Sequence, residues 1–147
     1  MQDLYQELII DHGTNPRNKK KPEHYDCTAY GNNPLCGDKI NIYVIMDKGS
    51  PEKIASVSFD GDGCAISTAS ASILSEAMVG QSIAEAKILF NNFVDTLTKS
   101  NANPNLPIKL EALKGVKQYP MRVKCATLAW HTLVAALDYN KSEVSTE

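Results

Sequence analysis

Three cysteines and one aspartate lie in three short motifs that are far apart along this chain. Cys36 and Asp38 stand in a Cys-Gly-Asp turn, Cys64 ends a Gly-Asp-Gly-Cys run, and Cys125 follows Arg-Val-Lys. Thiolate sulfur and carboxylate oxygen are ligands that Zn²⁺ accepts in a tetrahedral site, and four residues match that coordination number. The sequence therefore predicts one metal site, with sulfur or metal chemistry as the function.

Taken singly, each of these residues also has an ordinary interpretation. A lone buried cysteine is commonly a small core residue, and an aspartate after glycine commonly belongs to a turn. No Cys-x-x-Cys pair of the zinc-finger type is present in the sequence. The fourth cysteine, Cys27, lies outside these motifs, and we interpret it as structural.

Length and composition narrow the class of protein. A chain of 147 residues fits one domain, over residues 1–147, with enough buried surface for a core, so a metal would be optional for folding. The formal net charge of −2 gives no basic surface of the kind that binds nucleic acid. We therefore expect no nucleic-acid partner.

The sequence also argues against a membrane protein. No apolar stretch approaches the roughly 18–20 residues that span a bilayer, and Asp3 and Glu7 stand where a signal peptide would be basic and then apolar. We expect a cytoplasmic protein. In that reducing compartment, four cysteines favour metal binding or catalysis over disulfides.

Alternating apolar residues predict strands over residues 39–47 and 54–60, joined by a turn at Gly49-Ser50-Pro51. A shorter third strand is plausible over residues 25–30. Helical spacing of apolar residues predicts helices in the rest of the chain. Their expected places are residues 3–11, a helix from Cys64 to Gly80, a helix that begins with a Ser82/Glu85 capping box, a short helix over 110–116, and a last helix from Pro120 to about Tyr139.

Strands that precede most of the helices indicate an α+β fold, with a small antiparallel three-stranded sheet and helices packed on one side. Residues 141–147 read as a frayed, polar tail. In this fold, Cys64 and Cys125 both lie close to predicted helix N-termini, where the helix dipole lowers the pKa of a thiol. Both cysteines are therefore expected to ionise readily.

Cys36 differs because it precedes a strand in a loop. Gly37 lets the backbone turn so that Cys36 and Asp38 face one point, and a ligand on a loop is free to move. Arg122 is the better of two nearby cations to stabilise a departing Cys36 thiolate, since its guanidinium does not lose its proton. Lys124 is the other cation.

These motifs resemble the IscU-like superfamily of iron–sulfur cluster assembly, most closely its SufU branch. The resemblance is carried by Asn33-Pro34-Leu35-Cys36-Gly37-Asp38, Gly61-Asp62-Gly63-Cys64-Ala65-Ile66-Ser67 and Arg122-Val123-Lys124-Cys125-Ala126-Thr127-Leu128-Ala129-Trp130. It covers nearly the whole chain. Scaffold-type members carry a histidine where this chain has Lys124, lack the extra length between Gly80 and Pro120, and carry a Leu-Pro-Pro-Val-Lys motif that is absent here.

The resemblance implies a SufE/IscU-like fold and a zinc-bound, sulfurtransferase-like carrier. Such a carrier accepts persulfide sulfur from a pyridoxal-phosphate-dependent cysteine desulfurase of the SufS or NifS kind and delivers it to a downstream Suf assembly complex. Carried over residue by residue, Cys36, Asp38, Cys64 and Cys125 would hold zinc. Cys36 would be the sulfur acceptor, and Arg122 would assist it.

Two other functions use the same ligands. One is a scaffold that assembles a [2Fe–2S] cluster on the three cysteines, because thiolates bind iron as well as zinc. The other is a structural zinc module whose metal only supports folding. The sequence does not rank zinc above iron.

Overall fold

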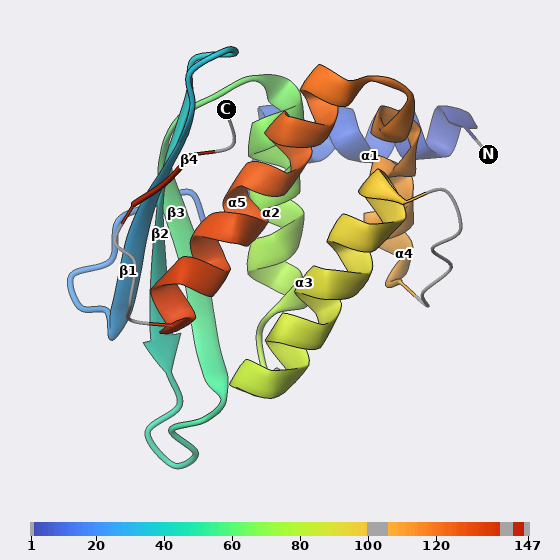
Figure 1. Ribbon diagram of the computed structural model, residues 1–147. Coiled ribbons are helices and arrows are strands. Elements are labelled where there is room, and N and C mark those ends of the chain that lie inside the picture. Colours follow the sequence, from blue (N-terminus) through green and yellow to red (C-terminus); the bar gives the residue numbers. More distant parts are fainter. Residues whose placement is uncertain (1, 100–105, 139–142, 146–147) are drawn as a thin grey trace.

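The computed structural model in Figure 1 describes residues 2–99, 106–138 and 143–145. Three antiparallel strands form the body of its sheet, and they are β1 (Cys27–Asn33), β2 (Asp38–Met46) and β3 (Ile54–Asp62). The predicted alternation holds in the central strand, where Ile40, Ile42, Val44 and Met46 are all buried. The strand expected over residues 25–30 is β1, which begins two residues later and continues to Asn33.

A fourth strand, β4 (Glu143–Ser145), pairs in parallel with residues 30–32 of β1 and gives the sheet order β3-β2-β1-β4. Our prediction that residues 141–147 are a frayed tail is therefore wrong for this segment. A strand of three residues is too short to show a period-two pattern. Backbone pairing on the open edge of β1 accounts for it instead, because an edge strand presents unpaired N–H and C=O groups.

The helices lie on one side of the sheet, as predicted, with α2 and α5 next to it (Figure 1). They are α1 (Gln2–Thr14), α2 (Ala65–Ala77), α3 (Ile83–Thr98), α4 (Ile108–Glu111), the 3₁₀ helix η1 (Ala112–Gln118) and α5 (Pro120–Asp138). The α+β class is confirmed. None of the helices in the described part of the chain is long and apolar enough to cross a bilayer.

Local signals set several helix ends. Ser82 and Glu85 form the predicted capping box at the start of α3, with each side chain bonded to the other residue's backbone N–H. Gly80 follows α2 with a φ of +85°, the left-handed conformation expected of it.

Other ends differ from the prediction. The helix α1 runs through Gly13 to Thr14, because a single glycine lowers helix stability without breaking the hydrogen-bond ladder. The short helix expected over 110–116 is α4 followed by η1, which together span residues 108–118.

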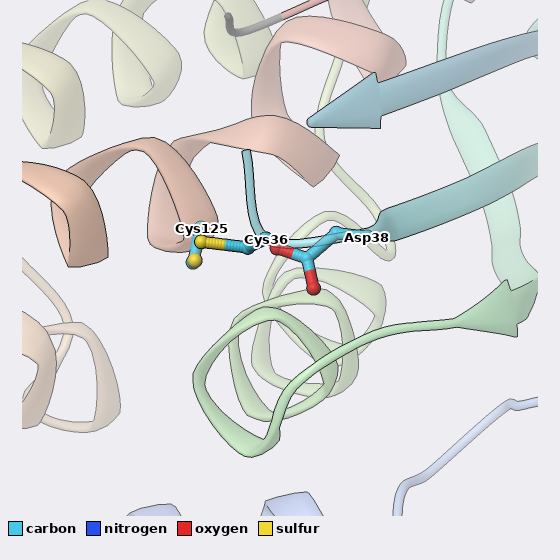
Figure 2. A group of neighbouring side chains, drawn as sticks. All are labelled: Cys36, Asp38 and Cys125. Atoms are coloured by element: carbon cyan, nitrogen blue, oxygen red, sulfur yellow. The ribbon is translucent and has the colours of Figure 1, made fainter. Parts of the chain in front are cut away.

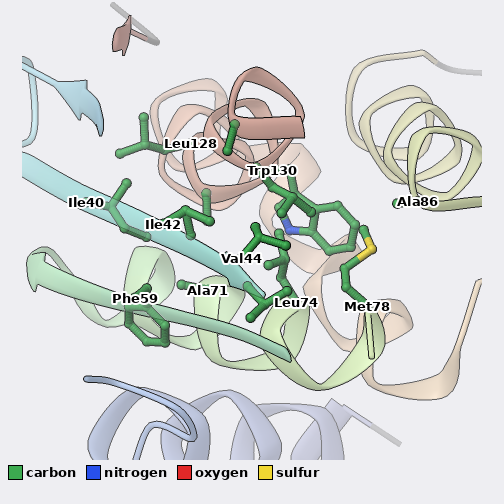
Figure 3. Packing of buried hydrophobic residues seen from close by; sticks show 14 of the residues in the cluster. Ile40, Ile42, Val44, Phe59, Ala71, Leu74, Met78, Ala86, Leu128 and Trp130 are labelled. Carbon is green, nitrogen blue, oxygen red and sulfur yellow. The ribbon is translucent and has the colours of Figure 1, made fainter. Parts of the chain in front are cut away.

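The core fills the space between the sheet and the two inner helices (Figure 3). Trp130 of α5 is fully buried and stacks on Phe93 of α3, with ring centroids 4.3 Å apart. Its indole N–H donates to the hydroxyl of Ser70 in α2 over 3.0 Å. This one side chain therefore ties α5, which carries Cys125, to both neighbouring helices.

Candidate metal centre

The β1–β2 hairpin positions Cys36 and Asp38. Asn33 and Asp38 are paired at the end of the two strands, and the four residues between them form the turn. The backbone carbonyl of Asn33 accepts from the N–H groups of Cys36 and Gly37, over 3.2 and 2.9 Å. Gly37 has a φ of +74°, which a side chain would strain, so it makes the predicted reversal of the backbone.

Cys64 is the N-cap of α2, as its motif predicted. Its sulfur accepts from the backbone N–H of Ser67 over 3.4 Å. Its own N–H donates to the Asp38 carboxylate over 2.8 Å, and its sulfur lies 4.0 Å from the other oxygen of that carboxylate. Asp38 thus joins the end of the hairpin to the start of α2.

Cys125 approaches the same place from α5. The helix begins at Pro120, so Cys125 lies in its second turn, and it is fully buried. The side-chain amide of Asn33 donates to the Cys125 sulfur over 3.7 Å. A residue of the hairpin and a residue of the last helix are therefore in direct contact.

Ligand atoms from three of the four predicted residues converge. One atom each from Cys36, Asp38 and Cys125 lies within 4.8 Å of the others, and Figure 2 shows the three side chains meeting from the hairpin and from α5. Cys64 is not in this group, but it borders the group through Asp38 and interacts with Cys125. The structure therefore brings the four sequence-predicted ligands into one neighbourhood, with Cys64 at its edge.

The prediction that Cys125 ionises readily is wrong for the metal-free protein. Burial raises the pKa of its thiol well above the ordinary value, and side-chain hydrogen bonds with Asp38, Cys36 and Cys64 raise it further. The physical reason is depth: removal from water disfavours the thiolate, and the second turn of α5 lies beyond the exposed amides at the helix end. A bound cation would reverse this balance, because a coordinating thiol is deprotonated.

Arg122 lies on the first turn of α5 and is exposed. The negative charge of Cys64, a side-chain hydrogen bond with Cys125, and then the charges of Cys125 and Cys36 raise the pKa of Arg122 above its ordinary value. Its guanidinium therefore lies within electrostatic reach of the three cysteines.

Two further residues complete the description of the site. Cys27 lies in the core cluster at the other end of β1, consistent with a structural role. Asn33 received no role from the sequence, although it stands in the Cys36 motif. The sequence pattern carried no signal for it, because the expected strand ended at residue 30. The structure shows that β1 extends to Asn33 and buries every second residue from Cys27 to Asn33.

The donor set fits a thiophilic cation such as zinc. Three thiols and a carboxylate supply the sulfur and oxygen ligands of a four-coordinate site. Two thiolates bound to one zinc are about 3.8 Å apart, from the usual Zn–S length of about 2.3 Å and tetrahedral angles. The ligand atoms of Cys36, Asp38 and Cys125 lie within 4.8 Å of one another, wider than this by only about an ångström. These three residues could hold the metal, and Cys64, with its sulfur 4.0 Å from the Asp38 carboxylate, is the candidate for the fourth ligand.

Comparisons with known proteins find relatives named for zinc-dependent sulfur transfer and for iron–sulfur cluster assembly. The zinc-dependent sulfurtransferase SufU of Bacillus subtilis (strain 168) is 37% identical over 131 residues, which cover 88% of this chain and 86% of the relative. The iron–sulfur cluster assembly scaffold protein IscU of Streptococcus pyogenes serotype M1 is 36% identical over 136 residues, covering 91% and 82%.

A solved structure has the same fold. It is the putative iron–sulfur cluster assembly scaffold protein for the SUF system from Fervidobacterium islandicum AW-1, with a TM-score of 0.83 at 34% identity over 92% of this chain and 98% of that one. The model of the NifU-like N-terminal domain matches residues 4–145. This chain therefore belongs to the NifU-like N-terminal domain family, which includes the SufU- and IscU-type proteins of iron–sulfur cluster assembly.

Proposed function

We propose that this protein is a zinc-bound sulfur carrier that accepts persulfide sulfur from a pyridoxal-phosphate-dependent cysteine desulfurase. It then delivers that sulfur to a downstream assembly complex of the Suf kind. The convergence of Cys36, Asp38 and Cys125 carries the proposal, together with their unequal exposure. A relative named as a zinc-dependent sulfurtransferase supports it.

Exposure and position together favour Cys36 as the acceptor. Cys64 is half-buried like Cys36, but its sulfur is held at the N-cap of α2 by the backbone N–H of Ser67. Asp38 and Cys125 are 1% and 0% exposed, so neither can meet a partner's sulfur without a large rearrangement. Cys36 is half-buried, and its neighbour Leu35 is 58% exposed. Cys36 lies in a turn, so a change of a few backbone angles moves its sulfur outward. Asp38, by contrast, begins a paired strand.

The transfer is a thiol–persulfide exchange. The Cys36 thiolate attacks the outer sulfur of the donor persulfide, a new S–S bond forms at Cys36, and the donor's S–S bond breaks. The donor cysteine leaves as a thiolate. Reactants and products therefore carry the same negative charge, and no external oxidant is needed. Zinc, when bound, keeps its cysteine ligands deprotonated at neutral pH. Delivery of the sulfur is the same exchange, in which a thiolate of the next acceptor attacks the outer sulfur of the Cys36 persulfide and Cys36 leaves as a thiolate.

Stimulation of the desulfurase tests the proposal. We would titrate zinc-loaded protein into the cognate cysteine desulfurase, with cysteine saturating and no added reductant, and measure turnover. A carrier relieves the enzyme of its persulfide, so turnover should rise and saturate. A flat response would contradict the sulfur-carrier function and leave the two alternatives.

Replacing Arg122 tests the assisting role. We expect Arg122→Gln to lower the stimulated kcat/KM about two- to fivefold, because a charge contact in water is weakened by solvent screening. Arg122→Lys should keep part of the effect, since it retains the charge without the planar fork. Lys124→Gln is the matched control on the same helix turn. Equal slowing by Arg122→Gln and Lys124→Gln would show that only the total charge matters.

A scaffold function is the second candidate, and it is favoured by the thiolate-rich donor set and the relatives named as scaffold proteins. Anaerobic reconstitution with iron and sulfide would test it. A [2Fe–2S] cluster that transfers to an apo-acceptor supports the scaffold, and failure to form one excludes it. A purely structural zinc site would instead show unchanged desulfurase turnover and a large loss of thermal stability on chelation.

A further inference from the structure

Asn33 contacts three of the four candidate ligands. It ends β1, is fully buried, and is the strand partner of Asp38. Its backbone carbonyl accepts from Cys36 N–H over 3.2 Å. Its side-chain Nδ2 donates to the sulfur of Cys125 over 3.7 Å. No other ligand-directed hydrogen bond from a buried side-chain amide is present among the described residues.

These contacts divide between backbone and side chain. Any residue at position 33 supplies the carbonyl that holds the Cys36 turn, so this contact does not require asparagine. The side-chain contact with Cys125 does require it. The remaining amide atom, Asn33 Oδ1, is buried and has no hydrogen-bond partner within the described part of the chain. A buried acceptor without a partner costs free energy, so this amide is a poor choice for stability alone.

We propose that Asn33 is a positioning residue of the metal centre, whose amide N–H holds the Cys125 sulfur as a fixed ligand while Cys36 leaves and returns. The inference rests on the proposed metal centre, but not on the identity of a partner. A metal-bound thiolate is only a hydrogen-bond acceptor, so it requires a donor of this kind. Hydrogen bonds from residues around a metal centre orient the ligands and tune their affinity.

The position of the donor matters for sulfur transfer. Once the Cys36 sulfur has moved outward, the metal would depend on the ligands that remain. Cys125 is the one that comes from α5, and Asn33 fixes it to the hairpin that bears Cys36 and Asp38. The amide thus connects Cys125 on α5 to the base of the turn that carries Cys36.

An isosteric substitution separates positioning from folding. Asn33→Leu keeps the branched shape and the number of side-chain heavy atoms, removes the N–H donor and also removes the unpaired oxygen. Asn32→Leu is the matched control, because neighbouring residues of a strand point to opposite faces of the sheet. Zinc affinity would be measured by competition with a chromophoric chelator. Co²⁺-substituted protein would report the thiolate-to-metal charge-transfer band, and the thermal transition of the metal-free protein would report folding.

We expect Asn33→Leu to bind zinc about 10- to 100-fold more weakly, the usual cost of losing such an outer contact. The charge-transfer band should move to lower energy, because a hydrogen bond to sulfur stabilises its lone pairs. The metal-free transition should stay within a few degrees of the wild type, and Asn32→Leu should resemble the wild type in all three measurements.

Wild-type zinc affinity and an unmoved band in Asn33→Leu would overturn the inference. So would a lower thermal transition with unchanged metal binding, since Asn33 would then act in folding alone. If Asn33→Leu does not fold, Asn33→Ala carries the same comparison. None of these readouts uses the desulfurase, so failure here is distinct from failure of the sulfur-carrier function.

Discussion

Cys36→Ala should abolish stimulation of the cysteine desulfurase and leave the fold intact. The exchange needs a nucleophilic sulfur at the exposed end of the centre, and the other two candidate cysteine ligands do not offer one. Cys125 is fully buried, and the sulfur of Cys64 caps α2. The stimulated part of the turnover should fall to the unstimulated rate, at every concentration of added protein.

Folding should survive this change because Cys36 lies in a turn outside the core cluster. Its backbone contacts with Asn33 do not depend on the side chain. The thermal transition of the metal-free variant should therefore stay close to that of the wild type. Zinc binding should weaken, since one candidate ligand is lost, and the metal content of each sample has to be measured beside its activity.

Cys27→Ala is the matched control. It also removes one thiol, but Cys27 lies at the opposite end of β1 from the metal centre, so stimulation should persist. Full stimulation by Cys36→Ala would refute the acceptor role of Cys36. Loss of stimulation in both variants would point to a general effect of stability, which the thermal transitions would show.

Much of the fold was accessible to sequence reasoning because its signals are local. Alternation along residues 39–47, the capping box at Ser82 and the left-handed Gly80 each depend on a few neighbouring residues. The parallel strand β4 was missed because its pairing lies between backbones that are distant in the chain. Periodicity of side chains carries no information about such a contact.

The candidate site also has features that short motifs predict and features that only the tertiary structure shows. Residue types and short motifs identified Cys36, Asp38, Cys64 and Cys125, and the structure brings them into one neighbourhood. The ionisation of Cys125 was misjudged because proximity to a helix end is visible in sequence, whereas depth below the surface is not. The contact of Asn33 with Cys125 was missed for a related reason, since it joins a strand to a helix that follows much later.

Trp130→Ala should destabilise the fold by about 3–5 kcal/mol, the usual cost of removing a fully buried tryptophan. The variant loses the stacking on Phe93 and the hydrogen bond to Ser70, and it leaves a cavity between α5, α3 and α2. For a chain of this length the thermal transition should fall by roughly 6–20 °C. Calorimetry or circular dichroism of the metal-free protein would measure it.

Trp130→Phe is the control that keeps an aromatic ring against Phe93. It should cost only about 1–2 kcal/mol, because the ring is smaller and the N–H is lost. Ser70 would still donate to the carbonyl of Ala126. A loss in Trp130→Ala no greater than in Trp130→Phe would show that the cavity collapses around the missing ring.

The same variant asks whether the centre depends on the core beneath it. Cys125 lies on α5 between its first turn and Trp130. Its contacts with Asn33 and Asp38 come from the hairpin and its contact with Cys64 from the N-cap of α2, so none of them is made by the Trp130 ring. Well below its transition, Trp130→Ala should therefore still bind one zinc per chain with nearly wild-type affinity. Folded protein that has lost its metal would contradict this. It would mean that the position of α5, set by Trp130, controls the centre more strongly than the hairpin does.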